Sequence, residues 1–344
     1  MPLENYILDI MEGRRKGRSL LRALSYLYRG GVALRNQAFD RDLIGSKSVD
    51  IPVVSIGNIV AGGTGKTPLV RLLAEELLKT LNVAIVSRGY RSQVEKTGET
   101  LKIDGQTSVS QCGDEPFWLA QKLSKAQVWV GKNRFKSAVL AYQSGADVII
   151  LDDGMQHRSL RRDFEVIVVD GEDPFGKGFF LPRGLLRDSP HRLVHADLIV
   201  VMDGSSETEA QLRKYTYAPI VFAKTHSEMS LQGKKVGVFC AIGRPQRFLK
   251  SVKSCGGEVV ATYFKPDHDP FTVDELNAFA DRSGADLLVC TEKDQVKLPT
   301  NFNCSLPVVA LPSRLEIHQG REEWDKILTN IREYHDRRVS SSTS

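Results

Sequence analysis

The sequence predicts an α/β protein in which a parallel sheet is flanked by helices and a second, smaller α/β lobe follows. Three observations lead to this prediction. Short runs rich in Val and Ile recur along the 344 residues, and many are separated by segments with helical periodicity. The runs are apolar throughout rather than alternating, which is typical of parallel strands covered on both faces. Polar stretches at 204–218 and 226–235 interrupt this rhythm, so we expect a lobe boundary near residue 225.

Strand and helix signals follow one another along both lobes. In the larger lobe, residues 37–225, we expect strands at 51–57, 82–87, 128–131, 147–153, 165–170, 197–203 and 219–225, and helices at 68–80, 114–124 and 133–144. In the smaller lobe, residues 226–320, we expect strands at 235–243, 259–264, 286–294 and 307–311, and helices at 245–254 and 272–282. The remainder, 321–344, should form a helix at 321–335 and a disordered tail from Val339 onward.

Composition narrows the class of protein. The five cysteines are odd in number and never form a C-x-x-C spacing, so we expect neither a disulfide framework nor a zinc site, and a reducing cytosol fits best. No stretch approaches the roughly 18 to 20 uninterrupted apolar residues of a spanning helix, and no secretory signal is recognisable at the N-terminus. The 47 basic and 42 acidic residues say little about nucleic acid, which we do not expect as a partner.

The N-terminal region, residues 1–36, concentrates positive charge among leucines and tyrosines. On a helix, Leu20, Leu24 and Leu27 would share one stripe while much of the charge lies elsewhere, as in helices that lie on anionic bilayers. A surface helix packed on its own domain explains the stretch equally well. The basic residues are Arg14, Arg15, Lys16, Arg18, Arg22, Arg29 and Arg35.

The stretch GGTGKT at 62–67 lies between an apolar run and a helical segment. Unpaired N–H groups at a helix start attract phosphate, and glycine lets the backbone approach it closely. Lys66 would bridge the β- and γ-phosphates of ATP, and the Thr67 hydroxyl would bind Mg²⁺. The full P-loop pattern asks for Gly at Val60, but the flanking strand and helix favour a P-loop over an incidental turn. The expected cradle comprises Ala61, Gly62, Gly63, Thr64, Gly65, Lys66 and Thr67.

Two carboxylates, Asp152 and Asp153, end the apolar run at 147–153. A P-loop fold places its magnesium carboxylate at the end of such a strand. Acids at strand ends also simply begin turns, so this assignment depends on the cradle. With it, the sequence predicts a P-loop NTPase-like sheet and a metal site formed by Thr67, Asp152 and Asp153.

Further polar residues stand at unusual places. Asp114 begins a helix, and the simplest account of it is an N-cap. His268 lies in a turn just before a helix whose Thr272 and Glu275 form a capping box, and a lone His in a turn is usually solvated. A kinase that acts on a hydroxyl benefits from a carboxylate that accepts the proton, which an imidazole can tune. Other such residues are Gln156, His157, Arg183 and Arg187.

Eight motifs together resemble the tetraacyldisaccharide 4'-kinase family, the lipid A 4'-kinases of Gram-negative bacteria. The resemblance runs from about residue 50 to 298, with a basic N-terminal region of the same kind. In chain order the motifs are GNIVAGGTGKTP, SRGYR, GDEP, DDGMQH, VVDG, FGKGFFLPRGLLRD, PDHDPFT and TEKDQVKL.

The resemblance implies transfer of the ATP γ-phosphate to the 4'-hydroxyl of a tetraacylated glucosamine disaccharide 1-phosphate. It implies two lobes joined by a two-stranded linker, with the reaction in the cleft between them. By the same resemblance, Asp114 is the base, His268 assists it, and Arg134 and Arg187 are candidate cations for the phosphate or the transition state. The family usually has Glu where Asp188 stands and a small residue in place of Arg183; if the Glu supports the metal, the shorter Asp188 would need a bridging water.

A lipid substrate stays in its bilayer, so we expect a monomer attached peripherally to the anionic cytoplasmic face of the bacterial inner membrane through residues 1–36. Two other functions remain open. A P-loop switch ATPase would often carry a lysine where this chain has Ala61, and a kinase for a soluble metabolite would not explain the basic apolar N-terminus. The TEKD stretch at 291–294 resembles the guanine-reading T-K-x-D of GTPases, but Glu292 breaks the spacing and a capped turn explains it as well.

Overall fold

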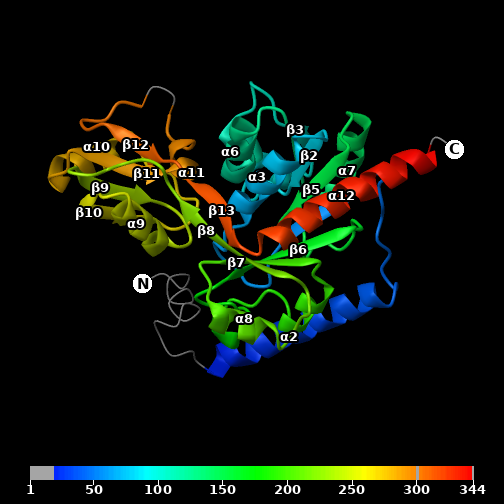
Figure 1. Cartoon of the computed structure of the whole chain (residues 1–344). Helices are drawn as coiled ribbons and strands as arrows, with labels where there is room; N and C mark the ends of the chain where they lie inside the picture. Colours follow the sequence, from blue (N-terminus) through cyan, green and yellow to red (C-terminus); the bar gives the residue numbers. More distant parts are fainter. Residues whose placement is uncertain (1–18, 300–301, 343–344) are drawn as a thin grey trace.

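The computed structural model describes residues 19–299 and 302–342, which form a larger and a smaller lobe (Figure 1). The larger lobe is built on a 9-stranded sheet that is parallel except for its two edge strands, and the predicted α/β class is confirmed. Its strands in spatial order are β13 (Arg314–Gln319), β8 (Ile220–His226), β7 (Leu198–Met202), β6 (Phe164–Asp170), β1 (Val53–Gly57), β5 (Val148–Asp152), β2 (Val83–Ser87), β4 (Gln127–Gly131) and β3 (Thr100–Lys102).

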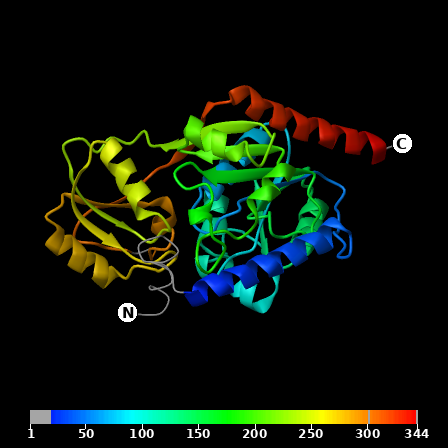
Figure 2. The same cartoon turned by 90° about the horizontal axis from the view of Figure 1, so that it is seen from below.

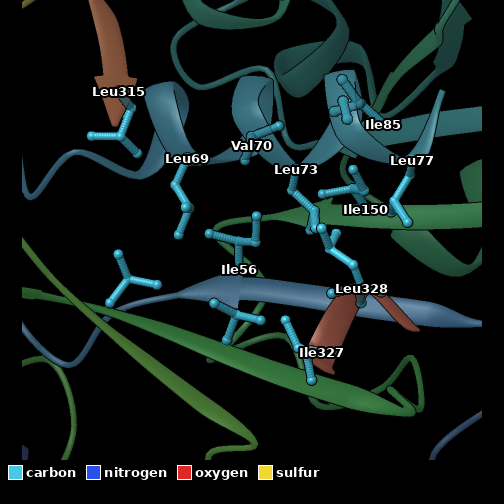
Figure 3. Close-up of a cluster of buried hydrophobic side chains, with 14 of the residues drawn as sticks. Ile56, Leu69, Val70, Leu73, Leu77, Ile85, Ile150, Leu315, Ile327 and Leu328 are labelled. Atoms are coloured by element: carbon cyan, nitrogen blue, oxygen red, sulfur yellow. The ribbon is translucent and has the colours of Figure 1, made fainter. Parts of the chain in front are cut away.

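Helices cover both faces of this sheet, which is why its central strands are buried throughout. On one face α3 (Lys66–Leu77) directs Leu69, Leu73 and Leu77 onto Ile56 and its neighbours, at the spacing of an amphipathic helix (Figure 3). Burial of each such leucine contributes about 1.5–3 kcal/mol. The other described helices of this lobe are α2 (Ser19–Asp40), α4 (Gln93–Thr97), α5 (Val109–Cys112), α6 (Asp114–Lys122), α7 (Arg134–Gln143), α8 (Ser206–Leu212) and α12 (Arg321–Ser342).

The helices α2 and α12 lie on opposite sides of the larger lobe (Figure 2). α12 joins the core with α3 through Trp324, Ile327 and Leu328. It continues to Ser342, so the expected disordered tail is wrong for 339–342. The basic residues Arg14, Arg15, Lys16 and Arg18 lie outside the described residues.

The smaller lobe has a parallel 4-stranded sheet in the order β10 (Glu258–Phe264), β9 (Lys235–Cys240), β11 (Leu287–Thr291) and β12 (Val308–Leu311). Its helices are α9 (Pro245–Ser254), α10 (Val273–Ser283) and the short α11 (Glu292–Gln295).

Two antiparallel strands, β8 and β13, run between the lobes (Figure 1). β8 leads out of the larger lobe and β13 returns to it. β13 falls within the range expected for the smaller lobe, yet it pairs with β8 as part of the larger sheet. Its Leu315 and Ile317 alternate with polar residues and are buried in the core of the larger lobe, while its backbone covers the edge of β8. Among the described residues, β13 pairs with no strand other than β8.

Candidate active site

The P-loop connects β1 to α3 with the geometry that phosphate binding requires. Gly62 and Gly65 have φ of 104° and 90°, a region that favours glycine, and a Cβ at Gly65 would lie 3.1 Å from the side chain of Met202. Among the described residues, no backbone acceptor engages the N–H groups of 62–66, which precede or begin α3. The loop therefore offers donors at the positive end of a helix.

Two residues of the expected cradle, Ala61 and Thr64, form hydrogen bonds with other parts of the protein. Ala61 donates its N–H to the carbonyl of Leu185 at 2.7 Å, so this amide is engaged away from a phosphate. The hydroxyl of Thr64 is buried and accepts a hydrogen bond from the side chain of Asn58 at 2.8 Å. Val60, which stands where the P-loop pattern has Gly, pairs with Leu186 and packs in the core. Val60 thus joins the start of the loop to the segment 176–188.

The predicted magnesium carboxylates lie at the carboxyl end of β5. Asp152 is buried and accepts a hydrogen bond from Ser87 at 3.0 Å, while Asp153 faces Lys66 at 3.5 Å. Burial and the neighbouring carboxylates of Glu115 and Asp153 raise the pKa of Asp152 to about 6. Burial acts on Asp153 too, but Lys66 and a nearby arginine hold its pKa well below the usual range.

These carboxylates fit a divalent cation. The oxygen donors of Thr67, Asp152 and Asp153 are of the type that Mg²⁺ prefers, and the raised pKa of Asp152 reflects negative charge gathered in a buried place. The described residues contain no group of three or more His, Cys, Asp or Glu side chains arranged to hold a metal by themselves. Mg²⁺ takes one or two carboxylates and completes its shell with water and substrate phosphates.

Two arginines converge on Asp153. Arg187 donates from both terminal nitrogens to its carboxylate, at 3.0 Å each. Arg134, at the start of α7, is only 4% exposed and donates to the Asp153 backbone carbonyl at 2.8 Å. Among the residues that the structure describes, none forms a hydrogen bond with its buried Nε. Both guanidinium groups therefore contact Asp153, the residue whose carboxylate faces Lys66 of the P-loop.

The predicted base and its histidine come together across the two lobes. His268 Nδ1 lies 2.9 Å from one carboxylate oxygen of Asp114 and 3.1 Å from the other. Burial alone would raise the pKa of Asp114, but the hydrogen bond and charge of His268, with nearby lysines, lower it. The hydrogen bond to Asp114 raises the pKa of His268 in turn. Each group therefore favours the charged form of the other.

The conformation of His268 points to a constrained site. Its φ is 70°, a region that a non-glycine residue seldom occupies, and its ring packs edge-on against Tyr90 at 5.6 Å between centroids. Asp114 and Tyr90 of the larger lobe thus hold an imidazole that the smaller lobe carries.

Sequence reasoning missed two charged residues of the site, Glu115 and Lys293. Lys293 of α11 extends from the smaller lobe to the larger one, where it pairs with Glu115 and lies 3.2 Å from the Thr67 hydroxyl. Burial disfavours both charges, yet their mutual attraction lowers the pKa of Glu115 and raises that of Lys293. The available signals were the positions of Glu115 within GDEP and of Lys293 within TEKDQVKL. The TEKD stretch itself is a capped turn, because Thr291 accepts from the Asp294 N–H.

The remaining polar residues of DDGMQH lie at the rim of this region. Gln156 donates to the Asn58 carbonyl at 2.8 Å. His157 contacts the Ser159 hydroxyl at 2.9 Å, and burial lowers its pKa to about 4, so it is neutral at pH 7. Both residues brace the loop after β5.

A second contact between the lobes lies beyond the P-loop. Asp170 at the end of β6 is fully buried and accepts hydrogen bonds from Arg244 and Arg247 of the smaller lobe. Gly243 lies against the Gly63 amide, since a Cβ there would be 3.2 Å from that nitrogen. The smaller lobe therefore lies directly over the P-loop.

Comparisons with known proteins point to one family over most of the chain. A family model described as Tetraacyldisaccharide-1-P 4'-kinase matches residues 17–332. The tetraacyldisaccharide 4'-kinase of Chlamydia pneumoniae is 39% identical over 307 residues, which cover 83% of this chain and 83% of that one. The same enzyme of Syntrophus aciditrophicus (strain SB) is 36% identical over 346 residues, or 89% and 92% of the two chains. The structure of LpxK from Aquifex aeolicus in complex with ATP matches with a TM-score of 0.73 at 29% identity, covering 91% of this chain and 98% of that one.

Proposed function

The chain belongs to the tetraacyldisaccharide-1-phosphate 4'-kinase family, and on that premise we propose how its residues perform the reaction. The enzyme uses ATP and Mg²⁺ to phosphorylate the 4'-hydroxyl of a tetraacylated disaccharide 1-phosphate, a step of lipid A biosynthesis. One observation carries our residue assignments. Asp114 of the larger lobe is hydrogen-bonded to His268 of the smaller lobe, beside the contacts of Lys293 with Glu115 and Thr67.

Asp114 accepts the proton of the attacking hydroxyl in this proposal. Its carboxylate is ionised at neutral pH because its pKa is lowered, and it is held by His268 rather than by the P-loop cations. The His268 ring orients the carboxylate, and the positive charge of its protonated form offsets the carboxylate charge in a buried place. Proton transfer of this kind typically contributes about 10²- to 10⁴-fold in rate.

The cradle residues Gly62 to Thr67 hold the triphosphate through backbone N–H groups and Lys66. Arg134 and Arg187 neutralise charge that spreads over the transferred phosphate oxygens. Thr67, Asp152 and Asp153 are the residues that would hold Mg²⁺, which would supply positive charge to the triphosphate.

The direct test of this activity is phosphate transfer. The full chain is incubated with γ-labelled ATP, Mg²⁺ and the acylated disaccharide 1-phosphate in detergent, and the lipid is extracted. We expect label in a lipid that carries one additional phosphate at the 4' position. Hydrolysis of ATP without labelled lipid would instead favour a switch ATPase.

The Asp114–His268 pair makes a pH-dependent prediction. In His268→Ala the burial of Asp114 remains, while the hydrogen bond and charge that lower its pKa are lost, so its pKa rises. We expect the acid limb of the pH profile of kcat/KM to move to higher pH in this variant. Titration of ATP is common to both proteins and cancels in the comparison. Acid limbs that superimpose would contradict the assignment of Asp114 as the titrating base.

We also propose that α2 attaches the enzyme to an anionic membrane surface at the cytoplasmic face of the inner membrane. One face of the helix packs on its own lobe through residues such as Leu21, Ser25 and Val32, as expected of a surface helix. The other face leaves Leu27 and Leu34 at 73% and 70% exposed. Basic residues near an anionic bilayer add about 1 kcal/mol each. None of the described helices is long and apolar enough to cross a membrane.

Charge on the exposed leucine stripe should weaken membrane attachment. We expect Leu27→Asp combined with Leu34→Asp to reduce sedimentation with phosphatidylglycerol vesicles, because the aspartates oppose both the apolar contact and the anionic surface. Activity on detergent-dispersed substrate should persist. Tyr217→Asp is the matched control, since Tyr217 is 96% exposed but lies outside α2. Equal sedimentation of all three proteins would refute the docking face.

A further inference from the structure

We propose that Asp188 is a positioning residue that fastens α2 to the active-site segment 176–188 and thereby holds Arg187 against Asp153. The inference deepens the proposed function, because it takes Arg187 as a cation of the phosphate site. It assigns to α2 a second task, distinct from contact with a membrane. It also gives Asp188 a place outside the metal site.

The carboxylate of Asp188 is directed at α2. It is 2% exposed, and its Oδ1 accepts from the Asn36 amide at 2.8 Å and from the Ser189 N–H at 2.8 Å. Its Oδ2 accepts from Arg35 at 3.1 Å. Both oxygens are therefore engaged by donors on the side of the segment that faces α2. A bridging water to the metal, which the sequence left open for this shorter side chain, is unnecessary in this arrangement.

Earlier turns of α2 contact the same segment. The Ser25 hydroxyl donates to the Phe180 carbonyl at 2.7 Å, and the Tyr28 hydroxyl lies 3.4 Å from the carbonyl of Arg187. The buried face of the helix thus follows the segment from Phe180 to Asp188. Of these contacts, only the pairing of Asp188 with Arg35 and Asn36 involves a buried charged group. Its loss would leave buried polar groups without hydrogen-bond partners, so it should cost the most free energy.

The opposite side of the segment is joined to the start of the P-loop. The N–H groups of Arg187 and Asp188 both donate to the Ile59 carbonyl, at 2.8 and 3.1 Å. The Arg187 guanidinium then makes its two parallel bonds to Asp153 and lies 3.4 Å from Asn58. A two-pronged bond of this kind depends strongly on where the arginine backbone sits. Because Asp188 is the next residue, a shift there moves the guanidinium directly.

Misplacement by about 1 Å at a reacting site can cost about 10²-fold in rate. We therefore expect Asp188→Asn to lower kcat by about 10- to 100-fold, with the KM for ATP little changed. Arg35→Ala and Asn36→Ala should each reproduce part of this loss. Asp40→Asn is the matched control, because Asp40 anchors the end of α2 to Arg158 and Arg192 without touching the segment. It should leave kcat unchanged.

A double-mutant cycle separates positioning of Arg187 from general support of the fold. If Asp188 acts through Arg187, Asp188→Asn should have no further effect on kcat in an Arg187→Ala background. Equal fold-losses in both backgrounds would overturn the proposal, as would an unchanged kcat in Asp188→Asn alone. Should Asp188→Asn fail to fold, the same cycle is run with Asn36→Ala. Failure of the proposed function is distinguishable, because the unmutated enzyme would then yield no labelled lipid.

Discussion

Asp114→Asn is expected to lower kcat by about 10²- to 10⁴-fold while the affinity for ATP changes little. The amide keeps the shape of the carboxylate and can still contact His268, but it cannot accept the proton of the incoming hydroxyl. A base acts chiefly in the transition state, so the loss should appear in kcat rather than in nucleotide binding. Single-turnover phosphate transfer and equilibrium binding of ATP measure the two quantities separately.

Two outcomes would assign Asp114 differently. A folded variant with weak Mg²⁺-dependent ATP binding would place the carboxylate in the metal site. A variant with wild-type turnover would mean that Asp114 serves only to begin helix α6 and takes no part in catalysis. Asp104→Asn provides a control, because Asp104 is a carboxylate of the same lobe that accepts hydrogen bonds from Gln106 and Thr107 of its own turn.

Lys66→Ala is expected to weaken ATP binding and turnover together. Hydrogen bonds to charged groups contribute about 1.5–3 kcal/mol, which corresponds to about 10- to 100-fold in kcat/KM. The variant also removes a cation that lies 3.5 Å from the Asp153 carboxylate. Initial rates at varied ATP concentration measure the effect.

Lys79→Ala serves as the control for Lys66→Ala. Lys79 follows the same helix but is mostly exposed and pairs only with Glu76 among the described residues. It should behave like the unmutated enzyme. If Lys66→Ala kept normal turnover, the triphosphate would have to bind elsewhere, and the P-loop assignment would fail.

The elements that local sequence determines were predictable. The strands around β1 and β5 are apolar because both faces are covered, and the P-loop glycines occupy backbone conformations that other residues resist. Asp152 and Asp153 could be placed at a strand end by the same reasoning. These features follow from a few neighbouring residues.

Features that depend on contact between the lobes were not predictable from the residues alone. Lys293 meets Glu115 across 178 positions of sequence, and His268 meets Asp114 across 154. Taken separately, these residues look like surface charges, a helix cap and a turn. Only the resemblance to a known family joined Asp114 to His268, and nothing joined Lys293 to Glu115.

The C-terminal helix illustrates tertiary contact overriding local propensity. Ser-rich sequence from Val339 suggested disorder, but Arg338 donates to the Val49 carbonyl at 3.0 Å and to the Asp163 carboxylate at 3.4 Å. These contacts with the body of the lobe hold the final turns in register. The same override explains β13, whose backbone pairs with a strand far earlier in the chain.

The central claim is that the P-loop and the Asp114–His268 pair serve one terminal phosphate from opposite sides. A crystal structure with a non-hydrolysable ATP analogue and Mg²⁺ tests it most directly. We expect the γ-phosphate to be held by amides of 62–67 and Lys66, with the Asp114 carboxylate facing it across a space that admits a hydroxyl. A γ-phosphate bound away from these amides, or an Asp114 carboxylate turned to the far side of the lobe, would contradict the account.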